Sequence, residues 1–512
     1  MSKPQSFIHG TLTLVITGLI VRFLGFFIRL IMVRAVGEEA IGLYHLVLPT
    51  FFFIFTFTQL GLPVAISQRV SKYYSKHDTQ TIRRLFYTSL TIALILSVTT
   101  SVLLFIIKDT FLLPLFSDQR VYLALVPLLW LIPLATCSSV LKGFFQGLHN
   151  MRPQGVSQLL EQIVRLLLLL YGLKDYPFDT VEVLAEKLLW QSVISECFSL
   201  FYLLILYVNV QLPKKQQAKR PQHLTKELLS IALPTTGMRM IHSFGHFLEP
   251  LIIHRQFVLN GLSITGATKA YGLLTGYIFP LVNFPMFITQ AIAQATIPSV
   301  TEAIEQKNMK QTHFRIHQAV RYSIMVGIFF TIILMVYPDT LLFLMYDTDK
   351  GITLIKWLAF FYFFTYLHFP FHAILQASDE THRAMFNSMI NFLVKIAALT
   401  YFMRWLDPMV GVIVSLSLLS IISTLLHYNS VKKATGYQLT FPFLNQVIGL
   451  YIFFLAITAS CRFALKLIDA SVWLELSSIP FLFIIFILLT FGFKLFTISE
   501  WRMLSQRKSK RH

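Results

Sequence analysis

Apolar stretches of about 20 residues recur along the whole chain and restrict its fold more than any other feature. A helix of about 20 apolar residues can cross the hydrocarbon core of a bilayer with every backbone group hydrogen-bonded internally. We count fourteen such stretches: 8–35, 43–68, 85–107, 121–146, 155–173, 184–208, 227–256, 270–299, 320–345, 352–377, 384–405, 408–428, 443–465 and 477–497. The sequence therefore predicts an all-α polytopic membrane protein with about fourteen transmembrane helices.

The charges of the chain follow a membrane topology. Hydrophobic residues make up 55% of the chain and charged residues only 13%, and the net charge is +19. With the N-terminus placed in the cytoplasm, inside loops and tails carry 23 of the 43 Lys and Arg, and outside loops carry 6. Basic residues concentrate on the cytoplasmic side of membrane proteins. We therefore expect cytoplasmic termini, a basic cytoplasmic tail at 501–512, and membrane lipids rather than nucleic acid as partners.

An internal repeat appears at an offset of 230 residues. Residues 145–152 then fall on residues 375–382, so that Gln146 matches Gln376. The polar residues of the next helix match as well: Ser157, Glu161 and Arg165 fall on Asn387, Asn391 and Lys395. A weaker match at an offset of 235 sets Pro63 against Pro298.

The repeat predicts the arrangement of the helices. Corresponding helices lie six apart, an even number, so both halves have the same orientation and are related by an axis along the membrane normal. We expect one lobe of helices 1–6 at 1–210, a second lobe of helices 7–12 at 225–430, and helices 13–14 at 440–500. Proline and glycine residues predict bends in the eighth helix, which contains Pro280 and Pro285.

The first predicted helix carries arginines at membrane depth. Arg22 and Arg29 lie inside the apolar stretch, and Arg34 marks its far edge. Each buried charge costs about 2.5 to 3.5 kcal/mol on insertion scales. Seven residues separate Arg22 from Arg29, which places both on nearly the same helical face. They either line a cationic cavity for an anionic substrate or pair with acids in a packed bundle.

The seventh predicted helix carries Arg239, His242, His246 and Glu249. The last three recur at i, i+4 and i+7, so one face could present two imidazoles and a carboxylate to a metal. The competing interpretation is a polar stripe that faces a central cavity, with Arg239 at about the depth of Arg22. The symmetry of the repeat favours the stripe, and we predict no metal site.

Two further polar groups lie at membrane depth. Glu161 and Arg165 form an i, i+4 pair that can neutralise itself, so we interpret the pair as structural. Lys395 shares its helix with Asn387 and Asn391, and needs an acid from elsewhere or a lowered pKa. These five residues are candidates for a second polar region of the cavity or for structural roles.

No catalytic constellation is found in the sequence. A Gly-rich phosphate loop followed by Lys-Ser/Thr is absent, and the inside loops 209–226 and 300–319 are too short for an ATPase domain. We therefore predict that the protein is not an enzyme, needs no cofactor, and takes its energy from an ion gradient, the membrane potential or another protein.

Five segments carry a family resemblance: Val21–Gly25, Gly61–Ser67, Lys142–Met151, Val156–Val164 and Phe247–Pro250. They resemble the stage V sporulation protein B family, in the polysaccharide transporter branch of the multidrug/oligosaccharidyl-lipid/polysaccharide (MOP) exporter superfamily. The resemblance implies alternating access and a lipid-linked sugar precursor as substrate. It also implies spore cortex peptidoglycan synthesis, the cytoplasmic membrane of a bacterium, and cell-wall synthesis enzymes as candidate partners.

The related lipid II flippases share an Arg-x-x-Gly element in the first helix, and this implies a substrate role for Arg22 and Arg29. Residues 51–57 and 279–285 lack the cavity arginines that those flippases place on helices two and eight. We expect the diphosphate head group of the lipid to meet Arg22, Arg29 and Arg239, since the planar guanidinium gives two charge-assisted hydrogen bonds at once.

Three other functions compete with this one. A drug or cation antiporter of the same superfamily would need an acidic cavity, and the first two helices carry no Asp or Glu at membrane depth. A membrane scaffold for cell-wall enzymes would tolerate replacement of Arg22 and Arg29. An integral-membrane glycosyltransferase would need a metal or a catalytic acid.

Overall fold

The structure is a computed structural model, and it describes residues 7–173, 176, 179–210 and 224–496. The predicted tail at 501–512 lies outside the described residues. The described residues form helices and the turns that join them, so the all-α fold is confirmed. The chain separates into two compact units, Met1–Gly276 (unit 1) and Tyr277–His512 (unit 2), which we describe one at a time.

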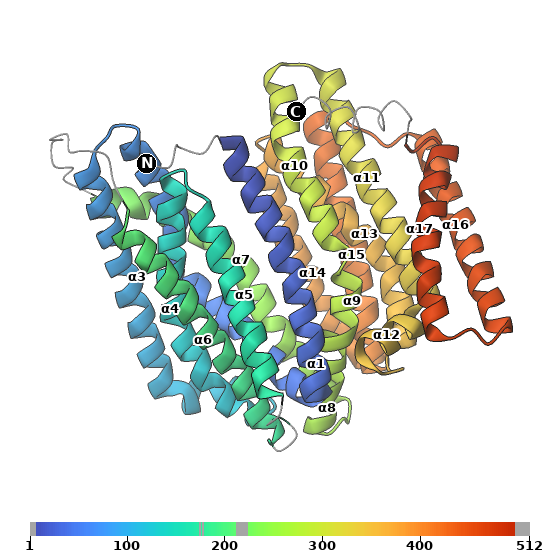
Figure 1. Cartoon of the computed structure of the whole chain (residues 1–512), viewed down its shortest axis with the longest axis horizontal. Coiled ribbons are helices and arrows are strands. Elements are labelled where there is room, and N and C mark those ends of the chain that lie inside the picture. Colours follow the sequence, from blue (N-terminus) through green and yellow to red (C-terminus); the bar gives the residue numbers. More distant parts are fainter. Residues whose placement is uncertain (1–6, 174–175, 177–178, 211–223, 497–512) are drawn as a thin grey trace. The chain divides into compact units, whose positions relative to one another are not determined.

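Unit 1 consists of long helices that run side by side (Figure 1). α4 packs against α2, α3 and α6, and α1 packs against α5, α7 and α8. The helices of this unit are α1 (Phe7–Gln59), α2 (Leu62–Tyr74), α3 (Thr79–Ile107), α4 (Tyr122–Gly147), α5 (Arg152–Gly172), α6 (Val181–Val208), α7 (Leu224–Leu259) and α8 (Ile264–Gly272). Three short turns, η1 (Lys108–Leu112), η2 (Leu113–Leu115) and η3 (Gln119–Val121), join α3 to α4.

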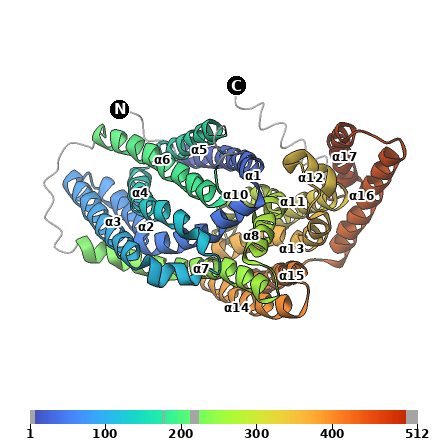
Figure 2. The same cartoon turned by 90° about the horizontal axis from the view of Figure 1, so that it is seen from below.

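Unit 2 follows α8 through the π-helical turn η5 (Leu273–Ile278). α13 packs against α10, α11 and α15, and α14 packs against α15. α16 and α17 lie at one edge of the unit, next to α11 and α12 (Figures 1 and 2). The helices are α9 (Phe279–Asn283), α10 (Met286–Glu305), α11 (Met309–Val336), α12 (Pro338–Tyr346), α13 (Ile352–Ala377), α14 (Thr381–Trp405), α15 (Pro408–Thr435), α16 (Phe441–Leu467) and α17 (Val472–Gly492).

The helices account for the predicted spans. Ten helices in the described part of the chain are long and apolar enough to cross a membrane, and the pair formed by residues 264–283 and 286–305 makes one further broken span. α7 covers the seventh predicted span. α1 and α2 cover the first two, because the 53 residues of α1 are bent at Gly37. Gly37 has φ 77° and ψ 178°, a conformation that is essentially confined to glycine.

The eighth predicted span is broken, as its prolines predict. After η5, α9 ends at Asn283 and α10 starts at Met286, and the two segments meet at an angle of 50°. Pro280 lies in the first turn of α9, and Pro285 directly precedes α10. A proline has no N–H to donate and bends or ends the helix before it, which explains the position of the break.

The internal repeat has a structural counterpart at two turns. His149 after α4 and Asp379 after α13 are 230 positions apart and have φ 58° and φ 59°. The turns close with equivalent hydrogen bonds, from Asn150 N to Phe145 O (3.1 Å) and from Glu380 N to Leu375 O (2.9 Å). The repeat that the sequence predicts therefore extends to backbone conformation.

A second pair of turns keeps the same offset. His77 and Lys307 have φ 52° and φ 54°, and each is followed by a helix cap. Asp78 accepts a hydrogen bond from the backbone N–H of Thr81, and Asn308 accepts one from that of Gln311, both at 3.0 Å.

The weaker match at an offset of 235 is therefore wrong. Pro63 lies in the first turn of α2, whereas Pro298 lies in the interior of α10. The two prolines share a sequence neighbourhood but have different places in their helices.

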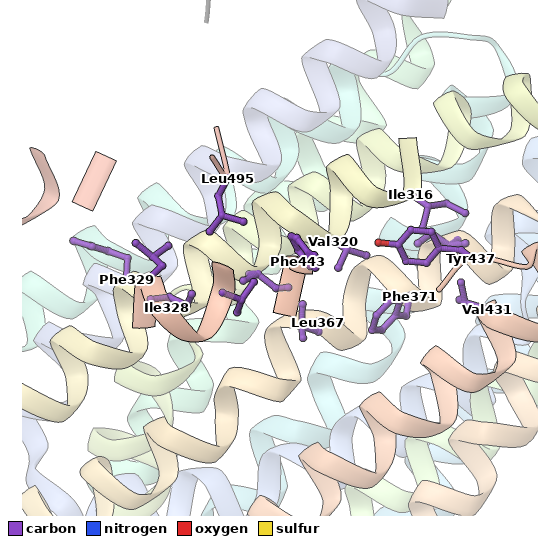
Figure 3. Close-up of a cluster of buried hydrophobic side chains, with 14 of the residues drawn as sticks. Ile316, Val320, Ile328, Phe329, Leu367, Phe371, Val431, Tyr437, Phe443 and Leu495 are labelled. Atoms are coloured by element: carbon purple, nitrogen blue, oxygen red, sulfur yellow. The ribbon is translucent and has the colours of Figure 1, made fainter. Parts of the chain in front are cut away.

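Each unit has its own hydrophobic core. In unit 1, Phe86 and Phe144 are buried with their ring centroids 5.0 Å apart, between α3 and α4. In unit 2, Phe329 of α11 packs against Phe454 of α16 and Phe486 of α17, in a cluster that extends along α13 (Figure 3). Each fully buried Phe contributes about 1.5–3 kcal/mol, so these contacts hold the last two helices on unit 2.

Candidate functional site

The two arginines of the first span lie on the surface of α1. Arg22 and Arg29 are both exposed. Within the described part of the chain, no hydrogen bond or ion pair joins either of them to another residue. α1 packs closely against α5 between them: a Cβ on Gly25 would contact Gln162 of α5 at 3.5 Å. The structure thus gives neither guanidinium a carboxylate partner among the described residues.

The polar pair of α5 neutralises itself. Arg165 donates a hydrogen bond from Nη2 to Oε1 of Glu161 at 3.0 Å, one helical turn away. This is the contact that the i, i+4 spacing predicts. Both side chains are about one fifth exposed, and the pair lies on the helix that packs against α1.

The polar stripe of α7 begins beside the second half of α1. Arg239 donates to Oε1 of Gln59 at 3.2 Å, which uses one of its five N–H groups. His242 and His246 approach each other at 3.2 Å through their Nε2 atoms, and His246 lies 3.6 Å from Glu249. Within the described residues, no group of three or more His, Cys, Asp or Glu side chains is arranged to hold a metal ion. Arg239 contacts α1 instead, and His242 and His246 are exposed.

In unit 2, the asparagines of α14 bind α15. Asn387 donates to Ser430 at 2.9 Å, and Asn391 donates to Ser423 at 2.8 Å. Ser423 also bonds to Nδ1 of His368 on α13. Asn387 and Asn391 therefore join three helices of unit 2. Lys395 lies one turn further along α14.

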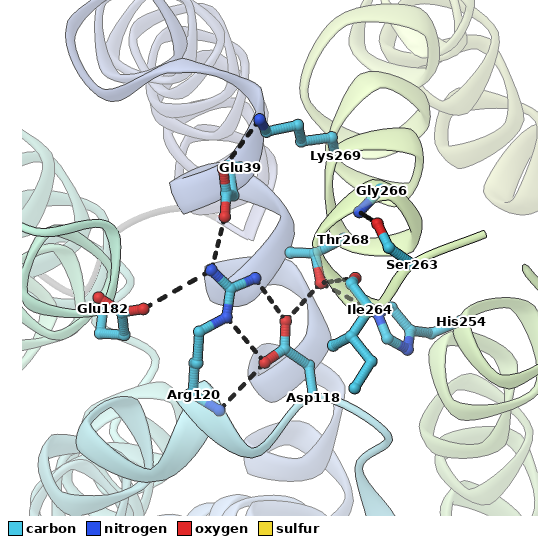
Figure 4. Close-up of polar contacts among 10 residues, drawn as sticks. All are labelled: Glu39, Asp118, Arg120, Glu182, His254, Ser263, Ile264, Gly266, Thr268 and Lys269. Atoms are coloured by element: carbon cyan, nitrogen blue, oxygen red, sulfur yellow. Dashed lines mark hydrogen bonds and ion pairs between the residues drawn. The ribbon is translucent and has the colours of Figure 1, made fainter. Parts of the chain in front are cut away.

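A second charged cluster, which sequence reasoning missed, surrounds Arg120 in unit 1 (Figure 4). Arg120 of η3 donates to Glu39 of α1 at 2.5 Å and to Asp118 at 2.8 Å and 3.0 Å. It lies 3.6 Å from Glu182 at the start of α6. We call Glu39, Asp118, Arg120, Glu182, Thr268 and Lys269 the Arg120 network.

Two residues of α8 complete the Arg120 network. Lys269 lies 3.3 Å from Oε2 of Glu39, on the side away from Arg120. Thr268 donates from its hydroxyl group to Asp118 at 2.6 Å and shares a second hydrogen bond with His254 of α7. The network thus connects four segments that lie far apart in the sequence.

The Asp118 carboxylate is the buried centre of this network, with a side chain only 1% exposed. Burial alone would raise the pKa of Asp118, but the hydrogen bonds from Arg120 and Thr268 outweigh it and lower the pKa below its ordinary value. The network therefore keeps a buried carboxylate charged.

One signal in the sequence could have indicated this network. Arg120 and Lys269 are two of only six basic residues in the loops predicted to lie outside, and the three acids of the network, Glu39, Asp118 and Glu182, lie in the same set of loops. Opposite charges at the same end of a helical bundle are candidates for ion pairs. The pairing itself depends on the fold, because 150 positions separate Asp118 from Thr268.

Solved structures share the fold. One is described as the inward-facing conformation of a multidrug resistance MATE family transporter of the MOP superfamily. It has a TM-score of 0.66 and 15% sequence identity, and the match covers 81% of this chain and 95% of that chain. A family model described as MatE matches residues 275–402. The arrangement of the helices and these matches show that the chain has the fold of the MATE family transporters.

Sequence relatives make the assignment more specific. The family model described as Polysaccharide biosynthesis protein matches residues 7–304, so the chain belongs to that family. Stage V sporulation protein B of Bacillus subtilis (strain 168) is 34% identical over 437 residues, which are 84% of each chain. Lipid II flippase MurJ of the same organism is 23% identical over 382 residues, 70% of this chain and 66% of that protein. The predicted resemblance is confirmed.

Proposed function

We propose that this transporter moves a lipid-linked precursor, a sugar carried on a polyprenyl diphosphate, across the bacterial cytoplasmic membrane by alternating access. The precursor serves the synthesis of spore cortex peptidoglycan. The similarity to stage V sporulation protein B and to a lipid II flippase supports this class of substrate. The observation that carries the proposal is the pair of exposed arginines on one face of α1.

The arginines suit the diphosphate group. A guanidinium donates two parallel hydrogen bonds to phosphate oxygens, and two arginines seven residues apart can reach the same anion from one helix. Arg239 keeps N–H donors for a third contact, because its hydrogen bond to Gln59 uses only one of them. His242, His246 and Glu249 extend this polar surface along α7.

The topology sets the direction of entry. With both termini in the cytoplasm, the head group enters from the cytoplasmic leaflet, and the polyprenyl tail stays in lipid. The polar residues Glu161 and Arg165 of α5, and Asn387, Asn391 and Lys395 of α14, hold neighbouring helices or extend the polar surface. The protein needs no cofactor, and its energy comes from an ion gradient, the membrane potential or a partner such as a cell-wall enzyme.

The test replaces the arginines one at a time. Arg22→Ala and Arg29→Ala should reach normal abundance in the membrane, because neutral residues insert at least as well as arginine. Flipping of a lipid-linked precursor in reconstituted vesicles should fail. Arg22→Lys and Arg29→Lys should restore it only partly, since lysine lacks the planar fork.

A matched control and a second measurement make the outcome decisive. Arg255→Ala removes another exposed arginine of unit 1 and should flip normally. Mass spectrometry of lipids that copurify with the protein should detect polyprenyl diphosphates with the wild type and less with Arg22→Ala. Normal flipping by abundant alanine variants would refute the substrate role of the two arginines, whereas absence of flipping by the wild type would favour a scaffold or a drug antiporter.

A further inference from the structure

The two halves of the repeat share a short motif where α1 meets α8. Residues 40–43 and residues 270–273 both read Ala-x-Gly-Leu, and they are 230 positions apart. This is the offset that the two pairs of turns show. The start of the second span, in α1, and the start of the eighth span, in α8, are therefore equivalent segments.

These equivalent segments contact each other reciprocally. A Cβ on Gly42 would overlap with the carbonyl oxygen of Thr268, and a Cβ on Gly272 would overlap with the carbonyl oxygen of Glu38. Glu38 and Thr268 are themselves 230 positions apart. The same contact is therefore made twice, with the roles of the two repeats exchanged. Such a reciprocal contact is typical of a two-fold relation. The two repeats therefore meet about a local two-fold axis in unit 1.

The Arg120 network spans this contact. Glu39 and Lys269 occupy equivalent positions, carry opposite charges and lie 3.3 Å apart. Asp118 of the first repeat accepts the hydroxyl hydrogen of Thr268 in the second. These two contacts cross from one repeat to the other. The contacts of Arg120 with Glu39, Asp118 and Glu182 all lie within the first repeat.

We propose that the Arg120 network is a latch that closes the outer end of the transporter. This inference rests on the proposed function and on the predicted topology, which places the bend of α1, the turns η1 to η3 and the start of α8 outside. Opening of the outer end separates α1 from α8, which breaks the Glu39–Lys269 ion pair and the Asp118–Thr268 hydrogen bond. Arg120 is a positioning residue that holds both carboxylates while the latch is open.

The geometry explains why such a latch can open. The helices meet through Gly42 and Gly272, each of which faces a backbone carbonyl group of the other helix. The Lys269 side chain is about half exposed, and an ion pair of that kind contributes little. The buried carboxylate of Asp118 keeps its hydrogen bonds from Arg120 when Thr268 leaves, so it is not stranded without a partner.

The experiment measures a distance across the latch and needs no substrate. Nitroxide labels are attached to cysteines at Thr110 of η1 and Thr265 of α8, both exposed, after Cys137, Cys197 and Cys461 have been replaced. Electron double resonance in lipid nanodiscs then gives the distance distribution. The decisive variant is the double substitution Thr268→Val with Lys269→Gln, because it removes the two contacts of the Arg120 network that cross between the repeats and leaves those of Arg120.

Two controls are matched to this variant. Asp179→Asn removes an ion pair of 2.6 Å with Lys187 that lies within the first repeat. Lys269→Arg keeps the cation opposite Glu39. Both should retain the dominant short distance of the parent protein.

In the double variant, the ratio of the population with a long distance to the population with a short distance should rise about fivefold or more. A fivefold change in this ratio corresponds to about 1 kcal/mol. An unchanged distribution in the double variant would overturn the latch, as would an equal change in Asp179→Asn. Because the readout is a distance, it separates failure of the latch from failure of lipid flipping.

Discussion

Asp118 is a buried carboxylate that remains charged because three hydrogen bonds from Arg120 and one from Thr268 satisfy it. Burial opposes its ionisation, and the hydrogen bonds reverse that effect, so its pKa lies below the ordinary value of 3.8. A group whose folded pKa is lowered stabilises the fold at pH values above its unfolded pKa. That contribution is lost as the pH falls through the folded value.

We expect Asp118→Asn to lower the free energy of unfolding by about 1.5–3 kcal/mol at neutral pH, because it weakens hydrogen bonds to a charged group. The difference from the wild type should be constant above about pH 5 and should narrow below pH 4. Thermal unfolding in detergent, followed by tryptophan fluorescence over a series of pH values, measures this. Asp179→Asn serves as the control. If Asp118→Asn lowered the free energy of unfolding by the same amount at every pH, the lowered pKa of Asp118 would be contradicted.

Contacts within one helix could be predicted from the sequence, whereas contacts between helices could not. The Glu161–Arg165 pair follows from a spacing of four, because a helix places such residues one turn apart. The partners of Arg120 depend on loops that meet only after the bundle has formed. The substrate role of Arg22 and Arg29 stays a prediction, because it depends on a bound ligand and not on contacts within the fold.

At the scale of elements, α1 shows how one glycine divides a helix. Its 53 residues would extend about 80 Å as a straight rod, far more than a bilayer core of about 30 Å. Gly37 turns the chain in a conformation confined to glycine while the residues on both sides remain helical. The apolar stretches predicted two separate spans, and hydrophobicity alone contains no information on whether the connection is a loop or a bent helix.

Gly37→Ala should therefore destabilise the protein by about 1–3 kcal/mol through backbone strain alone. A Cβ at this position would meet no atom within 4 Å, so packing is not involved. Gly18→Ala is the matched control, since Gly18 also has open space but a helical backbone, and alanine there should be neutral or stabilise by up to about 1 kcal/mol. Chemical denaturation in detergent micelles measures both. Equal effects of the two substitutions would show that the bend does not require glycine.

At the scale of the whole molecule, membrane orientation was predicted from the distribution of basic residues. The fold class and the repeat followed from the period and spacing of apolar and polar residues. The boundary between the two compact units, at residue 276, was not predicted. The sequence repeat instead predicts two lobes that meet near residue 210, and this division stays a prediction. A compact unit is defined by which helices pack together. Because α7 and α8 pack on α1, unit 1 extends beyond the predicted first lobe.

The topology is open to a labelling test. Single cysteines at Gln80 and Lys307, both exposed, should react with an impermeant maleimide only from the cytoplasmic side, and one at Asp349 only from outside. A cysteine at Lys508 in the basic tail should behave like the one at Gln80. Reaction of Asp349 and Lys508 from the same face would refute the number of helices in the second half.

The ion pair between Glu39 and Lys269 also limits how such a molecule can be built. In an assembly of two identical halves, a residue beside the two-fold axis faces its own copy, so a glutamate at this place would face a glutamate and repel it. Opposite charges here require two different residues at equivalent positions, which a single chain with two unlike halves provides. A dimer of the first half alone could reproduce the glycine contact but would carry like charges across it.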